Sequence, residues 1–306
     1  MSGLNIAIVG GSGFIGTHTS MELLDHGHDV TVIDLVPSCV KNTKYIKADV
    51  VDIDQARRAL ASSQFDVVYM FAAISDSAEN LRTPVLAVER NIVALTNILY
   101  LLNELHIPRI IFSSTVWVYS VSNDKFVDEE TDLMINNSGH VYTTCKLTCE
   151  ALIRNFHEMY NFEYTILRYG IAYGPGCHPD TILSKFMTNA INGKPLTITG
   201  TGDIYRNFLY VKDHARGNRL ALNPEAANRV LNLEGPEQIT LNRVAERVSE
   251  LHHGDVVIEH INQRLGDYQG KVVCSQLAYK TIGWKPTVLF NQGSEELYNH
   301  LANKLK

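Results

Sequence analysis

The chain has 306 residues, of which 45% are hydrophobic, and a formal net charge of −6 at pH 7. This length and composition are enough for one large or two modest domains with a sizeable core. The negative charge and the lack of a basic patch argue against nucleic acid as a partner.

Strand and helix signals alternate along the first half of the chain. Helical patterns cover residues 14–25 and 85–104. Apolar runs that predict strands cover residues 4–9, 29–35, 66–73, 108–115 and 163–169. Strands that are apolar throughout are typical of parallel sheets covered on both faces. The alternation therefore predicts an α/β fold with a doubly wound, Rossmann-type parallel sheet.

The second half of the chain has a different pattern of residue types. From Ile171 onward, glycines, prolines and short mixed segments replace the long apolar runs. This pattern predicts a smaller α+β C-terminal lobe that is interleaved with the first domain. We place the first domain at residues 1–170 and the lobe at 171–306, with elements at about 205–235 returning to the first domain.

A glycine motif, "GGSGFIG", follows the first predicted strand and opens the first predicted helix. Gly10, Gly13 and Gly16 would let backbone amides approach a pyrophosphate at the helix N-terminus. Eighteen residues later the second strand ends in Asp34, which can accept hydrogen bonds from ribose hydroxyls and would repel a 2′-phosphate. The alternative is a tight turn that binds nothing. Strand, glycines, helix and acid in register favour a dinucleotide site for NAD rather than NADP.

A second acid, Asp49, follows the predicted third strand in "ADVVD". Its side chain is placed to reach an adenine base. An aspartate that caps a loop through its own backbone explains the residue almost as well.

The stretch "HVYTTCKLTCEAL" carries Tyr142 and Lys146 four residues apart, so a helix places them on one face. A free tyrosine has a pKa near ~10, too high for a base at pH 7. A nearby ammonium and an oxidised nicotinamide would both favour the phenolate and lower that pKa. Lys146 can also hold the nicotinamide ribose. The spacing is frequent by chance, but beside a dinucleotide motif it predicts a general base for a sugar hydroxyl.

Several motifs resemble those of the extended short-chain dehydrogenase/reductases, in the NAD-dependent epimerase/dehydratase branch typified by UDP-glucose 4-epimerases. They occur in the family's order over nearly the whole chain: "GGSGFIG" (10–16), "FSSTVWVYS" (112–120), "LRYGIAYGPG" (167–176), "GKPLTITGTGDIYRNFLYVKD" (193–213), "VLNLEGPEQITLNRVAE" (230–246) and "RLGD" (264–267). The resemblance implies that Thr115 completes a catalytic set with Tyr142 and Lys146. It also places Asn91 at the family's helix asparagine.

The resemblance further implies NAD as the cofactor, a nucleotide sugar as the substrate, and a nucleotide-sugar-binding role for the C-terminal lobe. Besides the residues named above, the predicted cofactor site includes Phe14, Ile15, Val50, Ala72, Ala73, Ser113 and Tyr169. By the same resemblance Arg206 and Arg264 would clamp a diphosphate, and an arginine fork suits phosphate oxygens. A surface ion pair is the alternative for each arginine.

Several residues depart from the family pattern. Some of these departures bear on which reaction the enzyme catalyses, and others bear on which sugar it binds. The 4,6-dehydratases of the family carry Asp-Glu after the catalytic threonine, where this chain has Val116 and Trp117. Neither can transfer a proton, so dehydration by that mechanism is disfavoured. The predicted substrate side also holds Ser75, Asp76 and Ile171 at positions that differ from the usual 4-epimerases. Trp117 either packs the core or restricts the sugar.

The expected activity is NAD-dependent epimerisation of a nucleotide sugar, most simply at C4 through a transient 4-ketosugar. Net oxidation or reduction of such a sugar is the alternative. A 4,6-dehydratase and a non-catalytic NAD-binding regulator rank lower, the latter because the catalytic residues are intact. The resemblance also implies a homodimer through the helices that carry Asn91 and Tyr142.

The remaining signals predict what the protein lacks. The five cysteines are scattered without a C-x-x-C pair, which suits reduced thiols in a cytoplasmic protein. The histidines form no metal motif, so no metal is expected. The first strand begins near Leu4 without a preceding signal-peptide pattern. No apolar run approaches about eighteen residues, so no membrane span is expected.

Overall fold

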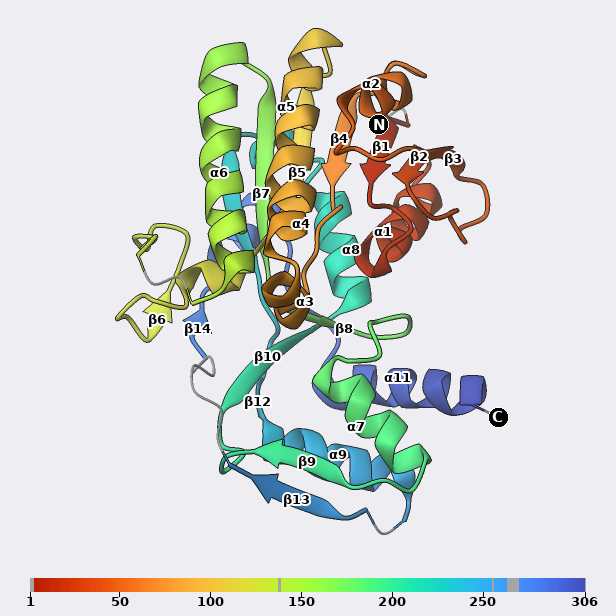
Figure 1. Ribbon diagram of the computed structural model, residues 1–306, viewed down its shortest axis with the longest axis vertical. Helices are drawn as coiled ribbons and strands as arrows, with labels where there is room; N and C mark the ends of the chain where they lie inside the picture. Colours follow the sequence, from red (N-terminus) through yellow and green to blue (C-terminus); the bar gives the residue numbers. More distant parts are fainter. Residues whose placement is uncertain (1–2, 137–138, 255, 263–269, 306) are drawn as a thin grey trace.

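A computed structural model describes residues 3–136, 139–254, 256–262 and 270–305. Its centre is a seven-stranded parallel sheet (Figure 1). In spatial order the strands are β11 (Arg229–Leu233), β7 (Glu163–Tyr169), β5 (Arg109–Thr115), β4 (Val67–Met70), β1 (Asn5–Val9), β2 (Asp29–Asp34) and β3 (Lys44–Lys47). The order reverses between β1 and β4, and a doubly wound sheet binds its ligand at such a switch point. The predicted fold class is confirmed.

Helices cover both faces of this sheet. One face is covered by α2 (Ile53–Leu60), α5 (Ala94–Glu104) and α6 (Val141–Tyr160). The other is covered by α1 (Phe14–Asp25), α8 (Val211–Leu220) and α10 (Gln276–Ile282). Along β1, Ala7 and Val9 are buried toward the first group, while Ile6 and Ile8 are buried toward the second. Because successive side chains of a strand point to opposite faces, a continuous apolar run is what this double burial requires.

The second lobe lies below the carboxyl ends of these strands (Figure 1). Its strands are β8 (Ile171–Tyr173), β10 (Tyr205–Tyr210) and β12 (Gln238–Thr240) in one sheet, and β9 (Leu196–Thr199) with β13 (Ile258–Ile261) in another. Its helices are α7 (Ile182–Ile191), α9 (Leu241–His252) and α11 (Phe290–Leu305). Smaller elements are the strand pair β6 (Phe126–Val127) with β14 (Val272–Val273) and the 3-10 turns η2 (Val116–Tyr119) and η3 (Pro224–Ala226).

The segment at about 205–235 is divided between the two lobes. Its β11 pairs with β7 at the edge of the large sheet, and its α8 packs on α1. Its β10 pairs with β8 and β12 in the small sheet. The chain therefore crosses between the lobes more than once. The ends of strands from both lobes lie at the junction between the lobes.

The helix that follows β4 is irregular. After the short α3 (Ser77–Arg82), α4 (Pro84–Val88) continues through a π turn, η1 (Glu89–Val93), into α5. The segment from Pro84 to Glu104 has 21 residues and contains an 18-residue window with a mean hydropathy of 1.5, so by length and composition alone it would suit a membrane span. Their inner side chains, such as Ile98 and Leu102, are buried in the core beneath α6. A core helix of a packed protein meets the same two criteria.

Candidate active site

The glycine motif forms a turn between β1 and α1 into which only a bare backbone fits. Gly10 has φ +82°, and a Cβ there would lie 2.4 Å from the backbone nitrogen of Ala72. A Cβ at Gly16 would lie 2.4 Å from the carbonyl oxygen of Gly10. Gly13 is the N-cap of α1 and offers no side chain to its first turn. The first amides of α1 therefore remain available to an anion, which fits the pyrophosphate of NAD.

The acid at the end of β2 lies beside this turn. One carboxylate oxygen of Asp34 accepts from the Ser12 amide at 3.0 Å, and the other accepts from the Val36 amide at 3.1 Å. Asp34 borders a cavity of about 250 Å³, here called the Asp34 cavity. Of the predicted cofactor residues, Gly10, Gly13, Asp49, Val50, Ala72 and Ala73 border it too. Two backbone donors thus fix a carboxylate at the place where ribose hydroxyls would bind.

The other predicted acid of this cavity, Asp49, already has a strong partner. Its carboxylate lies 2.5 Å from a guanidinium nitrogen of Arg90 and also accepts from the Val51 amide. Arg90 borders the Asp34 cavity as well. No motif in the amino-acid sequence predicts this position for Arg90. Asp49 therefore fixes its loop and also forms part of the cavity wall, while its contact with an adenine base stays a prediction.

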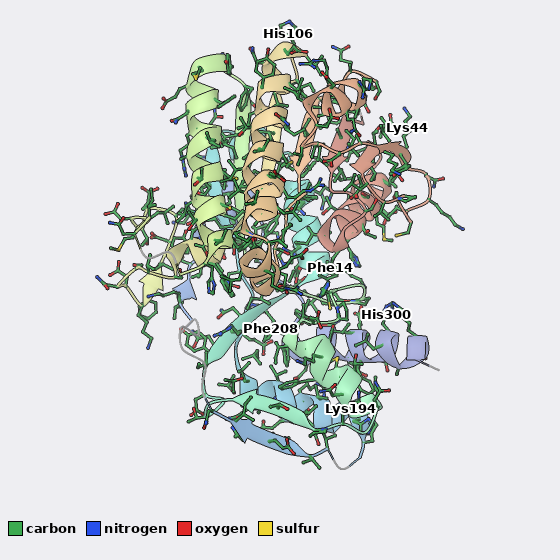
Figure 2. The ribbon with its side chains drawn as sticks, in the orientation of Figure 1. Phe14, Lys44, His106, Lys194, Phe208 and His300 are labelled. Carbon is green, nitrogen blue, oxygen red and sulfur yellow. The ribbon has the colours of Figure 1, made fainter. Side chains whose placement is uncertain are left out.

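A larger cavity of about 430 Å³, here called the catalytic cavity, also borders the glycine turn. The predicted cofactor residues Phe14, Ile15, Gly16, Ser113 and Tyr169 border it. The predicted substrate residues Ser75, Trp117 and Ile171 border it as well. In Figure 2, Phe14 lies at the level where the two lobes meet and Phe208 lies within the lower lobe. The wall of the cavity draws Phe14 from the first lobe and Ile171 and Ala172 of β8 from the second, so the cavity lies at the junction of the lobes.

The three predicted catalytic residues meet at this cavity. Thr115 ends β5, and its hydroxyl hydrogen-bonds the Tyr142 phenol. Lys146, one turn further along α6, lies with its Nζ 5.7 Å from the centroid of the Tyr142 ring. That Nζ donates to the Ser113 carbonyl oxygen at 2.6 Å. The strand end and the helix face therefore bring a hydroxyl, a phenol and an amine to one wall.

Burial controls the protonation of the two ionisable groups. Burial raises the pKa of Tyr142, and the hydrogen bond from Thr115 opposes this only in part. Burial lowers the pKa of Lys146 to about 8, although the nearby Cys149 and Glu150 act in the other direction. The sequence predicts a lowered pKa for Tyr142 from the neighbouring ammonium, and that is not the balance found here. Removing a phenolate from water costs more than the hydrogen bond returns.

A buried polar network fixes the helix that carries Tyr142 and Lys146. Glu150, on α6, binds Arg168 of β7 through two hydrogen bonds of 3.0 and 2.7 Å. Ser114, next to Thr115, donates to Glu150 at 2.6 Å. Burial alone would raise the pKa of Glu150, but the hydrogen bonds and charge of Arg168 lower it. Helix α6 is thereby tied to β5 and β7 by a charged pair with almost no exposure.

Three of the predicted residues that the structure describes border neither of these cavities. Asn91 lies in the π turn, where its side-chain amide donates to the carbonyl oxygens of Ala87 and Ile74. Asp76 caps α3 by accepting from the Glu79 amide at 2.7 Å. Arg206 borders a separate small pocket. Arg264 lies outside the described residues.

The sequence also left part of the wall unassigned. Cys177, His178 and Thr181, from the loop between β8 and α7, border the catalytic cavity. The only signal was the turn-rich "GPGCHP", which marks a loop without saying where it lies. His18 of α1 contacts the carbonyl oxygen of Pro175 through its Nε2 at 2.9 Å, which holds this loop against the glycine turn.

Comparison with known proteins agrees with this geometry. Residues 6–233 match the model of the NAD dependent epimerase/dehydratase family. The chain is 24% identical to a UDP-glucuronate 4-epimerase of Thermodesulfobacterium geofontis, over 95% of this chain and 94% of that protein. It is 26% identical to a putative UDP-glucose 4-epimerase of Methanocaldococcus jannaschii, over 97% and 98%. A UDP-glucose 4-epimerase of Thermotoga maritima solved with UDP-glucose superimposes with a TM-score of 0.92 at 25% identity, covering 99% of this chain and all of that one.

Proposed function

Because this chain is an enzyme that belongs to the NAD-dependent epimerase/dehydratase family, we propose that it epimerises a nucleotide sugar at C4 through a transient 4-ketosugar. The observation that carries the proposal is the meeting of Thr115, Tyr142 and Lys146 at one wall of the catalytic cavity, next to the glycine turn. The similarity to 4-epimerases of UDP-glucose and UDP-glucuronate supports the same reaction.

NAD would be held along the two cavities by the amides of the glycine turn, by Asp34 at the ribose, and by Lys146 at the second ribose. When bound, NAD supplies the acceptor for a hydride from the sugar carbon and the donor that returns it. Asp34 would sit where NADP carries a phosphate, and two like charges there would repel, which favours NAD.

Tyr142 is the base for the sugar hydroxyl. Its phenolate accepts the proton and becomes the phenol, while Thr115 donates a hydrogen bond to the same sugar oxygen, which orients that oxygen for the transfer. Burial raises the pKa of the phenol. A positive charge brought close by an oxidised nicotinamide would lower it. The proton transfer thus becomes favourable only in the assembled complex.

The residues after Thr115 disfavour dehydration by the mechanism of the family's 4,6-dehydratases. Val116 is buried and Trp117 borders the catalytic cavity with its indole, so η2 presents no acid or base next to Thr115. Elimination of water from C5 and C6 needs both. Return of the hydride to the other face of the ketosugar therefore completes the proposed cycle.

The proposal is tested by proton NMR of the purified protein with NAD and a panel of UDP-, GDP-, CDP- and dTDP-hexoses. A second anomeric signal that grows to an equilibrium ratio, without accumulation of NADH, is the expected result. Accumulation of a ketosugar with stoichiometric NADH would mean that the enzyme catalyses net oxidation and not epimerisation. No change in any sugar of the panel would refute the proposal.

We also propose that two copies of the chain pair through α4, α5 and α6, which lie side by side on one face of the large sheet (Figure 1). Val85, Val88 and Tyr100 are exposed along the outer face of the first two helices, and Met159 is exposed on α6. Exposed apolar side chains at helical spacing are typical of an interface. Sedimentation of the wild type as a dimer, and of Val88→Glu/Tyr100→Glu as a monomer, is expected. A monomeric wild type would refute the pairing.

A further inference from the structure

The segment between β4 and α3 contributes to both cavities. Ile74 borders the Asp34 cavity, Ser75 borders the catalytic cavity, and Ala73 borders both. Residues 71–76 form neither helix nor strand, so no ladder of backbone hydrogen bonds fixes the carbonyl groups around Ser75. The place of the Ser75 hydroxyl at the cavity wall therefore depends on the side chains that hold this segment.

Asn80, in the middle of α3, holds the backbone on both sides of Ser75. Its Nδ2 donates to the carbonyl oxygen of Ile74 at 3.1 Å and to that of Asp76 at 2.6 Å. The side chain is 1% exposed, and α3 packs against α4 and α6, so the amide has a fixed place. One side-chain group thus holds the carbonyl groups of the residues before and after Ser75, although Asn80 itself borders neither cavity.

A second asparagine supports one of these carbonyl groups. Asn91, in η1, donates from its Nδ2 to the carbonyl oxygen of Ile74 at 3.3 Å and to that of Ala87 at 2.8 Å. A carbonyl oxygen has two lone pairs, so that of Ile74 can accept from both asparagines. Asn91, which the sequence predicts as a cofactor residue, thus contacts the wall of the Asp34 cavity through Ile74.

The nitrogen atoms of these amides, and not the oxygen atoms, make the contacts. The Oδ1 atoms of Asn80 and Asn91 are buried and have no hydrogen-bond partner in the part of the chain that the structure describes. Burial of an unpaired acceptor costs free energy, and an apolar side chain of similar size would avoid that cost. What Asn80 adds at this position is therefore its hold on the two carbonyl oxygens.

On the basis of the proposed function, we infer that Asn80 is a positioning residue for the nucleotide sugar, because its amide holds Ser75 where the Ser75 hydroxyl can contact the substrate. Hydrogen bonds weaken steeply as their distance and angle depart from the optimum. Loss of the Asn80 amide would remove both contacts and let the exposed Ser75 move with its backbone. Asn80 acts on the sugar through Ser75 and does not touch the ligand.

The test is calorimetric titration of the NAD-loaded protein with UDP-glucose in a double-mutant cycle. Ser75→Ala should raise the dissociation constant about three- to tenfold, which corresponds to the loss of one hydrogen bond. Asn80→Ala should raise it by a similar factor. The double variant Ser75→Ala/Asn80→Ala should bind no more weakly than Ser75→Ala alone, because the position of a hydroxyl that is absent has no effect.

Asn5→Ala is the matched control. The Nδ2 of Asn5 also makes two hydrogen bonds, to the Ser63 hydroxyl and the Gln64 carbonyl oxygen at 2.7 Å each, and its Oδ1 is also buried without a partner among the described residues. Asn5 begins β1, at the opposite end of that strand from the glycine turn. Asn5→Ala should lower the melting temperature as Asn80→Ala does and should leave the binding of UDP-glucose unchanged.

A conservative variant keeps the cycle usable. Asn80→Ser retains one hydroxyl donor and should lose less affinity than Asn80→Ala. It takes the place of Asn80→Ala in the double variant if that protein does not fold. Thermal melting of each variant establishes that it is folded before its dissociation constant is interpreted.

The possible results distinguish this inference from the proposed function. Wild-type affinity in Asn80→Ala, or a double variant in which the two single effects multiply, would overturn the inference and leave the epimerase intact. No binding of UDP-glucose by the wild type would overturn the inference, and only a silent NMR panel would overturn the proposed function as well. A loss of affinity in Asn80→Ala that disappears in the Ser75→Ala background supports the inference.

Discussion

The two ends of the cleft are built in different ways. At the cofactor end, the glycine turn, Asp34, Ala72 and Ser113 lie at or just beyond the carboxyl ends of neighbouring parallel strands. At the substrate end, the small pocket that Arg206 borders draws its wall from η2, β8, β10, the end of β11 and the segment before β14. The first arrangement is fixed by the register of one sheet. The second depends on how the lower lobe packs against that sheet.

This difference decides where the predicted residues fall. Nearly every residue predicted for the cofactor borders one of the two cavities, Asn91 being the exception. On the substrate side Asp76 caps a helix, and Arg206 borders the separate small pocket instead of the catalytic cavity. The residues of a site can be predicted from local sequence motifs when the strands of one sheet position them. A site assembled from distant segments requires the tertiary structure.

The largest expected effect is at the point where the two ends meet. Tyr142→Phe removes the proton acceptor while keeping the ring, so kcat should fall by about 10²–10⁴-fold. Binding of NAD, measured by fluorescence titration, should be unchanged because the glycine turn and Asp34 are untouched. Tyr160→Phe, at the other end of α6, is the matched control and should keep full activity. Retained turnover in Tyr142→Phe would refute the mechanism.

The next effect concerns the buried pair that ties α6 to the sheet. Glu150→Gln leaves the Arg168 guanidinium buried without its counter-charge, which should lower the free energy of unfolding by about 3–5 kcal/mol. Urea denaturation measures it. The double variant Glu150→Gln/Arg168→Met should recover much of the loss, since no unpaired charge remains. Glu250→Gln, from an exposed ion pair on α9, is the control and should change stability little.

A stable Glu150→Gln variant would contradict this view of the cofactor end as a rigid frame. If the frame is rigid, the destabilised variant should also lose kcat more than it changes KM. Its Tyr142 would no longer be held against Thr115, whereas other predicted substrate residues, such as Ser75 and Ile171, stay in place. Equal changes in both constants would mean that the pair is needed only for folding.

The difference between the cofactor end and the substrate end also explains which site residues could be predicted from the sequence. The glycines and Asp34 are separated by a fixed number of residues along one βαβ unit. Their spacing in the sequence is therefore enough to predict that they lie close together. Tyr142 and Lys146 share a helix face for the same reason. Arg90 carries no such signal. Its ion pair with Asp49 joins η1 to the loop after β3, and these two segments are far apart in the chain.

A smaller effect should follow from the acid at the end of β2. Asp34→Ala removes the acceptor for the ribose hydroxyls, and loss of hydrogen bonds to a charged group should weaken NAD by about 1.5–3 kcal/mol. The preference for NAD over NADP should relax, because the charge that repels a 2′-phosphate is gone. Parallel titrations with NADH and NADPH measure both. Asp29→Ala, at the start of the same strand, should leave them unchanged, and an unaltered preference in Asp34→Ala would refute its role.

The smallest expected effect separates two neighbours at the substrate end. Asp76 accepts a hydrogen bond at the N-terminus of α3, so Asp76→Ala should lower stability by about 0.5–2 kcal/mol. Asp76→Asn keeps an acceptor at the cap and should lose less. Neither should change KM, because Asp76 does not border the catalytic cavity, whereas Ser75 does and Ser75→Ala should raise it. Steady-state kinetics with thermal melting decides between them. A raised KM in both Asp76 variants at normal stability would place that carboxylate on the substrate and show that α3 rearranges on binding.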